Sequence, residues 1–188
     1  MPMRRPEPSE RLVYASVVEG LLRHGVQEPL PLVLKERLRH IGVDVDRPLL
    51  PAYPVPMWMH CLRAVAEELY PGEPLERALR ALAVRHAEGY GHTVVGHALY
   101  AVARMMGPRR MVHRLPHLLA SGDNYTRAEL LELAPAHYEL RMNSEVDMPG
   151  YAEGLMEALL GLSGAREPQV QELERGDGHT RFSLRWAG

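Results

Sequence analysis

Three histidines fall within one short stretch of the sequence, RHAEGYGHTVVGHALY, which runs from Arg85 to Tyr100. Two side chains of one helix can chelate a metal ion only when they lie three or four positions apart, because only those positions share a face. His86 and His92 are six positions apart, and His92 and His97 are five apart. A regular helix therefore cannot bind a metal ion through any two neighbouring members of this set alone, and we predict no metal site here.

Two other pairs of residues have side chains that could bind a metal ion or act in catalysis. His113 and His117 have the four-residue spacing of metal ligands, but Pro116 lies between them and disturbs that helical turn. His60 and Cys61 are adjacent, and adjacent helical positions point about 100° apart, so they do not form a nucleophile–base pair. We predict that Cys61 is a small buried apolar residue. The sequence predicts no catalytic residues.

If this region forms one helix, a stripe of mostly polar side chains runs along one of its faces. The stripe contains His86, Tyr90, Thr93, His97, Tyr100 and Arg104. One interpretation is a hydrogen-bonded buried seam or a subunit contact. The other is the wall of a pocket that faces a small ligand. On the second interpretation the candidate ligand-binding residues are Tyr90, Thr93, His97 and Tyr100, with Tyr125 at the mouth of the pocket.

A second stripe on the same helix consists of small residues, Gly89, Gly96 and Ala103, which are seven positions apart. Glycine inside a helix costs about 0.5–1 kcal/mol relative to alanine, so these positions need a reason in packing. We expect this stripe to permit the close approach of another backbone.

Composition bounds the class of protein. The chain has 188 residues, a formal net charge of −2 and a single cysteine. These values fit one ordinary domain without a nucleic-acid surface, and they exclude an intrachain disulfide and a thiolate-rich metal site. The sequence contains neither an apolar run of about 20 residues nor a secretory signal, so we expect a cytoplasmic protein without a transmembrane segment. We expect a flexible tail over residues 1–10 and a single α+β domain over residues 11–188.

The pattern of the first two thirds of the chain predicts mainly helices. An extended entry at 12–18 leads into a helix that stops near Gly25, and a second helix over 31–41 ends at Gly42. A proline-rich extended loop over 44–56 follows, and then come a helix over 57–70, a long helix over 75–106 and a helix over 109–120. The long helix would measure roughly 48 Å at 1.5 Å per residue. Gly89 and Gly91 allow a bend or a break near its middle.

The last third changes to a period of two residues. RAELLEL and HYELRMN meet at Ala134–Ala136 and predict a hairpin in which Tyr138, Leu140 and Met142 share one face. A punctuated amphipathic helix follows in PGYAEGLMEALLGLSG, and a second hairpin closes the chain. Helices followed by the order β-β-α-β-β indicate an α+β fold, with an N-terminal helical layer packed on a C-terminal antiparallel sheet.

Several ordered markers carry a family resemblance over almost the whole chain: VEGLL, IGVDVDRPLLPAYP, EGYGHTVVGHAL, MGPRR, SGDNYT, PGYAEGL and FSLRW. Together they resemble a domain family of unknown function that is expanded as paralogues in the myxobacteria, and its pattern has no assigned catalytic residues. The order of elements resembles, more distantly, the four-vinyl-reductase, haem–nitric-oxide-binding and TRAPP-subunit group of α+β domains. That resemblance implies a small apolar ligand, a haem or an acyl chain, although the Tyr-x-Ser-x-Arg motif of the haem-binding members is absent.

Three functional hypotheses follow. The first is a non-enzymatic regulatory or signalling module that binds a small apolar ligand, with haem as one possibility, or a protein partner. The second is an interaction scaffold that forms a homodimer without a pocket, through the glycine stripe or through anchors at Met57, Trp58 and Met59. The third is an enzyme or haem or metal protein that uses the histidine-rich helix together with ligands supplied by the fold.

Overall fold

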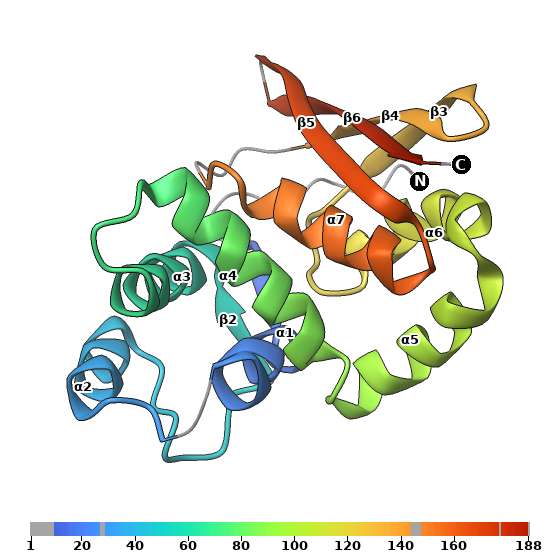
Figure 1. The fold of residues 1–188 in the computed structure, drawn as a ribbon. Coiled ribbons are helices and arrows are strands. Elements are labelled where there is room, and N and C mark those ends of the chain that lie inside the picture. The colour runs from blue at the N-terminus through green and yellow to red at the C-terminus, as the bar shows by residue number, and fades with distance from the viewer. Residues whose placement is uncertain (1–9, 27–28, 144–147, 177, 188) are drawn as a thin grey trace.

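The computed structural model describes residues 10–26, 29–143, 148–176 and 178–187 of the chain. Helices dominate the first 120 residues, and an antiparallel sheet with one further helix follows them (Figure 1). This arrangement confirms the α+β class and the predicted order of elements. The predicted flexible tail, residues 1–10, lies outside the described residues except for Glu10.

The chain begins with a small two-stranded sheet and a group of helices. In order these elements are β1 (Leu12–Tyr14), α1 (Ala15–Glu19), the π-helical segment η2 (Gly20–Gly25), α2 (Leu32–Ile41), β2 (Ala52–Pro54) and α3 (Val55–Leu69). Helix α2 ends at Gly42, which has a φ of 117°, as predicted for a glycine that closes a helix.

The proline-rich segment is shorter than predicted. It ends in β2, which pairs antiparallel with β1, and Pro56 already lies in the first turn of α3. Proline is tolerated there because the backbone N–H groups of the first turn donate to no carbonyl within the helix, so the missing N–H of proline costs no helical hydrogen bond.

The helix predicted over 75–106 is broken near its middle, where Gly89 and Gly91 allowed a bend or a break, so two helices occupy this range. Helix α4 (Leu75–Tyr90) and helix α5 (Val94–Met106) meet at a corner. Thr93 has an extended backbone, and its hydroxyl accepts a hydrogen bond from the Gly96 amide at 3.0 Å while donating to the Tyr90 carbonyl at 2.8 Å. The side chain of Thr93 thus starts a new helix, and a stripe continuous across the corner does not exist.

Close backbone packing at Gly89 confirms part of the glycine prediction. Segment η2 crosses α4 so closely that a Cβ atom on Gly89 would lie 2.1 Å from the Gly20 carbonyl oxygen. Gly96 serves a different purpose, because its Cβ would lie 1.8 Å from the Tyr90 carbonyl oxygen inside the corner. The two glycines therefore admit different neighbours and do not form one contact surface.

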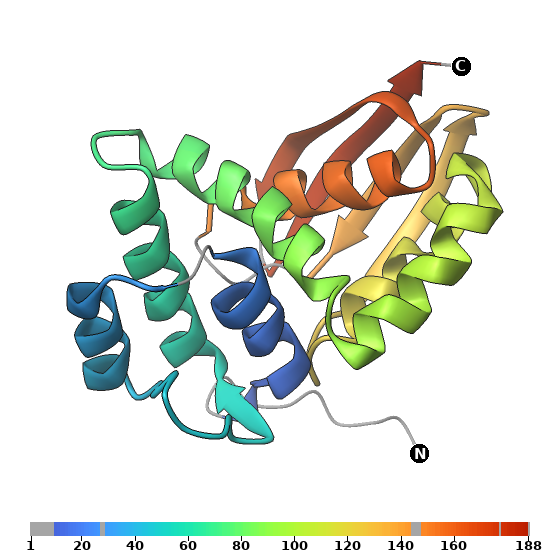
Figure 2. The ribbon, with the colours of Figure 1, turned by 60° about the horizontal axis from the view of Figure 1, so that its bottom comes forward.

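The second half of the chain builds a four-stranded sheet and the helices that cover it. Its elements are α6 (Pro108–Ala120), β3 (Ala128–Ala134), β4 (His137–Met142), α7 (Tyr151–Leu162), β5 (Arg166–Gly176) and β6 (His179–Ala187). The strand order is β3-β4-β6-β5, and all neighbours are antiparallel. Helices α6 and α7 lie against one face of this sheet in both views (Figure 1, Figure 2). Tyr138 and Leu140 are fully buried on that face, as the alternation predicted.

Apolar side chains gather in two clusters. The first cluster draws mainly on α2, α3, η2 and the start of α4, and the second joins α6, α7 and the inner face of the sheet. The C-terminal half of α4 lies between them, and α7 packs along α4 from Glu76 to His86. Within the described ranges, none of the helices has the length and apolar character needed to cross a membrane.

The tight crossing at Gly89 leads to a stability prediction. Gly89→Ala places a methyl group against backbone atoms that cannot rotate away, so we expect a loss of about 1–3 kcal/mol in the free energy of unfolding. The matched control is Gly161→Ala in α7, where the nearest atom to the new Cβ lies at 3.9 Å. Higher helix propensity should make this control neutral or more stable by about 0.5–1 kcal/mol. Urea denaturation measures both values, and equal stability of the two variants would contradict the crossing.

Candidate functional site

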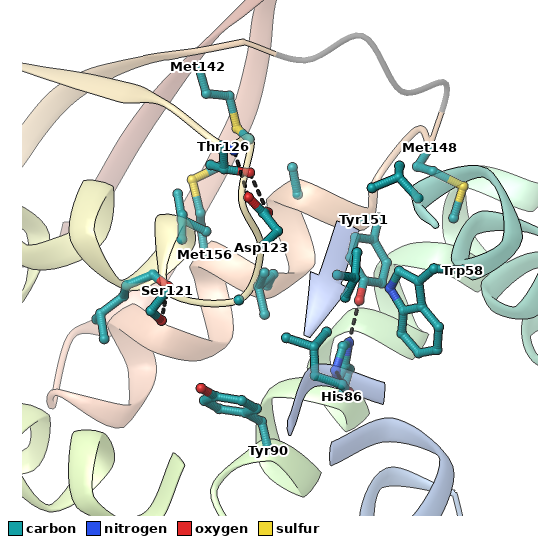
Figure 3. A pocket seen from close by; sticks show the side chains of 18 of the residues that line it. Trp58, His86, Tyr90, Ser121, Asp123, Thr126, Met142, Met148, Tyr151 and Met156 are labelled. Carbon is teal, nitrogen blue, oxygen red and sulfur yellow. Dashed lines mark hydrogen bonds between the residues drawn. The ribbon is translucent and has the colours of Figure 1, made fainter. Parts of the chain in front are cut away.

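A cavity of about 200 Å³ lies where the two apolar clusters meet. Its walls come from β1, α1, α3, α5, α6 and α7, from the last turns of α4, and from the segment between α6 and β3 (Figure 3). Most of the lining is apolar and includes Val17, Leu62, Leu119, Met148, Met156 and Leu159. The cavity is therefore an apolar space that is lined by elements from both halves of the chain.

His86 borders the cavity and is buried with both ring nitrogens in use. Its Nε2 lies 2.8 Å from the carbonyl oxygen of Val17, and a carbonyl can only accept, so Nε2 carries the proton and donates. In the neutral ring Nδ1 then accepts from the hydroxyl of Tyr151, the contact drawn in Figure 3. Trp58 meets the ring edge-on at a centroid distance of 5.8 Å. Burial lowers the pKa of His86 to about 4, against a smaller opposing effect of the bond to Val17.

A tight turn after α6 supplies the acidic part of the lining. The carboxylate of Asp123 accepts hydrogen bonds from the amides of Tyr125 and Thr126 at 2.9 and 2.6 Å, and from the Thr126 hydroxyl at 2.6 Å. Burial raises the pKa of Asp123, while these three hydrogen bonds act in the opposite direction. The carboxylate is thus occupied by its own turn and is not directed at a free partner.

The same turn is fastened to the start of the chain. The side-chain carbonyl of Asn124 accepts from the Leu12 amide at 2.9 Å, and its NH₂ group donates to the Glu10 carbonyl at 2.9 Å. The Tyr14 amide donates to the carbonyl of Gly122 at 2.9 Å. The segment SGDNYT therefore joins β1 to the beginning of the four-stranded sheet, and it does so at the edge of the cavity.

The structure divides the five predicted ligand-binding residues into three that line the cavity and two that do not. Tyr90, Tyr100 and Tyr125 line the cavity, and the rings of Tyr90 and Tyr100 lie 5.9 Å apart. Thr93 is buried but caps α5, and His97 is exposed on α5, so neither lines the cavity. The break between α4 and α5 causes this division, because it turns Thr93 and His97 away from the face that carries Tyr90.

Sequence reasoning missed several lining residues that other elements contribute. Trp58 comes from α3, Ser121 and Asp123 from the turn, and Tyr151 from the first turn of α7. Ser121 and Asp123 lie in the predicted turn SGDN, and Tyr151 lies in the marker PGYAEGL. Neither pattern indicates which helix these side chains contact. His86 is buried and hydrogen-bonded, as the interpretation as a buried seam expected, and it also borders the cavity.

The remaining candidates have structural roles. Cys61 is fully buried and its pKa is raised to about 12 by burial, which confirms it as an apolar residue. His113 lies on α6 with Nε2 3.4 Å from a carboxylate oxygen of Glu132. Trp58 is only 4% exposed, so its predicted role as a dimer anchor is wrong. Over the described part of the chain, no three histidine, cysteine or acidic side chains converge in a way that could hold a metal ion.

Comparison with known proteins identifies one family and one fold. The family described as a protein of unknown function (DUF2378) matches residues 11–187. No curated protein matches the chain. Among solved structures, a single-residue variant of Tt H-NOX has a TM-score of 0.71 at 17% identity, covering 94% of this chain and 96% of that chain.

Two further structures are similar over most of the chain. One is described as modulating heme redox potential through protein-induced porphyrin distortion (TM-score 0.67, 18% identity, 92% of this chain and 98% of that chain). The other is an oxygen-binding H-NOX domain related to soluble guanylate cyclases, in its oxygen complex (TM-score 0.56, 21% identity, 83% and 85%). These likenesses show that the chain has the H-NOX fold, and they agree with the distant resemblance to haem–nitric-oxide-binding domains.

The buried imidazole leads to a prediction about pH. The pKa of His86 is lower in the folded chain than the 6.5 of an exposed histidine, so the unfolded chain binds this proton first and stability falls as the pH drops from about 6.5 towards 4. Between pH 7 and pH 4.5 the loss should be on the order of 2–3 kcal/mol. His86→Gln keeps one donor and one acceptor, and should remove this part of the pH dependence.

Urea denaturation of the wild type and His86→Gln at both pH values measures the difference. The control is His97→Gln on the exposed face of α5, which should retain the full pH dependence of the wild type. An identical fall in stability for His86→Gln and the wild type would contradict a neutral, buried His86.

Proposed function

We propose that this chain, which belongs to the DUF2378 family of proteins of unknown function, is a non-enzymatic regulatory module that binds a small, largely apolar molecule. The observation that carries the proposal is the apolar cavity of about 200 Å³ at the junction of the two clusters. Because both halves of the chain line this cavity, we also propose that residues 11–188 act as a single domain around it.

The size of the cavity limits the ligand. An engineered protein cavity of about 150 Å³ binds benzene, and sites for drug-sized molecules measure about 300–1,000 Å³. The cavity between α4, α7 and the SGDNYT turn lies between these values. A ligand of one or two rings, or an aliphatic chain of similar volume, fits this range.

The donor set of the cavity does not fit haem. Among the described lining residues His86 is the only histidine, and both of its nitrogens already form hydrogen bonds. Burial raises the pKa of Tyr90, Tyr100, Tyr125 and Tyr151, which keeps these phenols protonated and poor as iron ligands. No lysine or arginine among the described lining residues is placed to meet the two carboxylates of a haem. These observations favour a ligand without a metal.

The hydrogen bonds around the cavity support a regulatory role. The SGDNYT turn forms part of the wall and holds β1 through Asn124 and Gly122, so a molecule that displaces the turn also displaces the start of the chain. Tyr151 forms another part of the wall and fixes α7 to α4 through His86. Occupancy of the cavity would therefore bias the packing of both halves, which is the physical basis of a sensing module.

Binding of a hydrocarbon probe tests the proposed function. Toluene at ten times its dissociation constant should stabilise the wild type by about 1.4 kcal/mol, or about 3–6 °C in Tm. Ala152→Phe projects a ring into the cavity from α7 and should abolish the shift. Ala101→Phe, on the exposed face of α5, is the matched control and should retain it. Thermal unfolding followed by circular dichroism gives all three values, and equal shifts in both variants would sink the cavity as the binding site.

Haem is tested separately by titrating the purified chain with haemin and recording the absorbance spectrum. We expect no saturable spectrum of histidine-ligated haem at stoichiometric concentration, because His86 offers no free nitrogen. A saturable spectrum of this kind that disappears in His86→Gln would overturn the argument from the donor set.

A further inference from the structure

Several polar groups around the cavity are hydrogen-bonded within the protein. The carboxylate of Asp123 is occupied by its turn, and the Asn143 NH₂ group donates to the Tyr125 carbonyl at 2.9 Å. The Ser121 hydroxyl donates to the Leu118 carbonyl at 2.6 Å. These three side chains are therefore already engaged within the protein and are not free to bind a ligand.

The hydroxyl of Tyr90 is buried without such a partner. Of the described side chains that line the cavity, it is the one whose buried polar atom has no partner at hydrogen-bonding geometry. Burial raises the pKa of Tyr90, so the phenol remains a neutral O–H donor. The hydroxyls of Ser16 and Ser121 lie near enough to oppose part of this rise in pKa, but neither forms a hydrogen bond of normal geometry with Tyr90. In Figure 3 this hydroxyl lies on the side of the cavity that Ser121 occupies.

The charge of the lining restricts the ligand further. Asp123 is the ionisable acid of the wall, and no lysine or arginine among the described lining residues offers a counter-charge. A carboxylate or phosphate in this space would be desolvated without a cationic side chain in the described lining to pair with, and it would be repelled by Asp123. A neutral ligand with an acceptor atom meets neither penalty.

We propose that the ligand is a neutral molecule with an apolar body and one carbonyl-type acceptor, which receives a hydrogen bond from the Tyr90 hydroxyl, and that organic acids of the same size are rejected. The inference rests on the proposed function, because it assigns the chemical class of the ligand for the same cavity. It goes further by giving Tyr90 the role of the specificity-determining donor.

Three probes of nearly equal size distinguish the proposed ligand class from the proposed binding function: ethylbenzene, acetophenone and benzoate. Isothermal calorimetry on the full chain at pH 7 should show acetophenone binding about tenfold more tightly than ethylbenzene, the value of one neutral hydrogen bond. Benzoate should bind at least about a hundredfold more weakly than acetophenone, because its charge finds no partner.

Variants of two tyrosines locate the donor. Tyr90→Phe should leave ethylbenzene binding unchanged and bring acetophenone down to the same affinity. Tyr125→Phe is the matched control, since Tyr125 also lines the cavity, and it should keep the tenfold preference. Loss of the preference in Tyr125→Phe but not in Tyr90→Phe would overturn the assignment of the donor.

A measurement on the wild type does not depend on how the variants fold. The infrared carbonyl band of bound acetophenone should move to lower frequency than in a hydrocarbon solvent, because the oxygen accepts a hydrogen bond. An unshifted band, equal affinities for ethylbenzene and acetophenone, or tight binding of benzoate would each refute the ligand class while leaving a binding cavity in place. Failure of ethylbenzene and acetophenone alike to bind would refute the proposed function itself.

Discussion

One buried imidazole constrains much of this structure. His86 can be buried at low cost only as a neutral ring, and a neutral ring needs one acceptor for its proton and one donor for its free nitrogen. Val17 and Tyr151 meet these needs from α1 and α7, on elements that are far apart in the sequence. Because both bonds must be satisfied at once, the positions of α1 and α7 relative to α4 are fixed together. The walls of the cavity follow from this arrangement.

The backbone of α4 makes the arrangement possible. Glycine at position 89 lets η2 cross at a distance that no side chain would allow, and this crossing brings the preceding helix α1 close enough for the Val17 carbonyl to reach His86. At the end of α4 the Thr93 cap starts α5 in a new direction. That corner folds Tyr100 back towards Tyr90, so two residues ten positions apart face the same space.

Sequence patterns predicted the elements better than the site. Period-two alternation located both hairpins, and Gly42 located the end of α2, because these signals are local. Gly89 and Gly91 indicated that the helix over 75–106 could break, but the apolar spacing gave no sign that the Thr93 hydroxyl would start a new helix. With the helix broken, Thr93 and His97 no longer share a face with Tyr90. Trp58, Asp123 and Tyr151 reach the cavity through tertiary packing, about which spacing along the chain carries no information.

The H-NOX fold and the chemistry of this cavity have to be argued separately, because a shared fold positions a cavity without dictating its ligand. In this chain the imidazole at the cavity is used to hold helices together, and its protonation would break the bond that Tyr151 donates. A side chain cannot both supply that structural bond and coordinate a metal through the same nitrogen. The chain therefore keeps the architecture while its only described histidine at the cavity serves packing. What remains for recognition is the apolar surface and the unpaired hydroxyl of Tyr90.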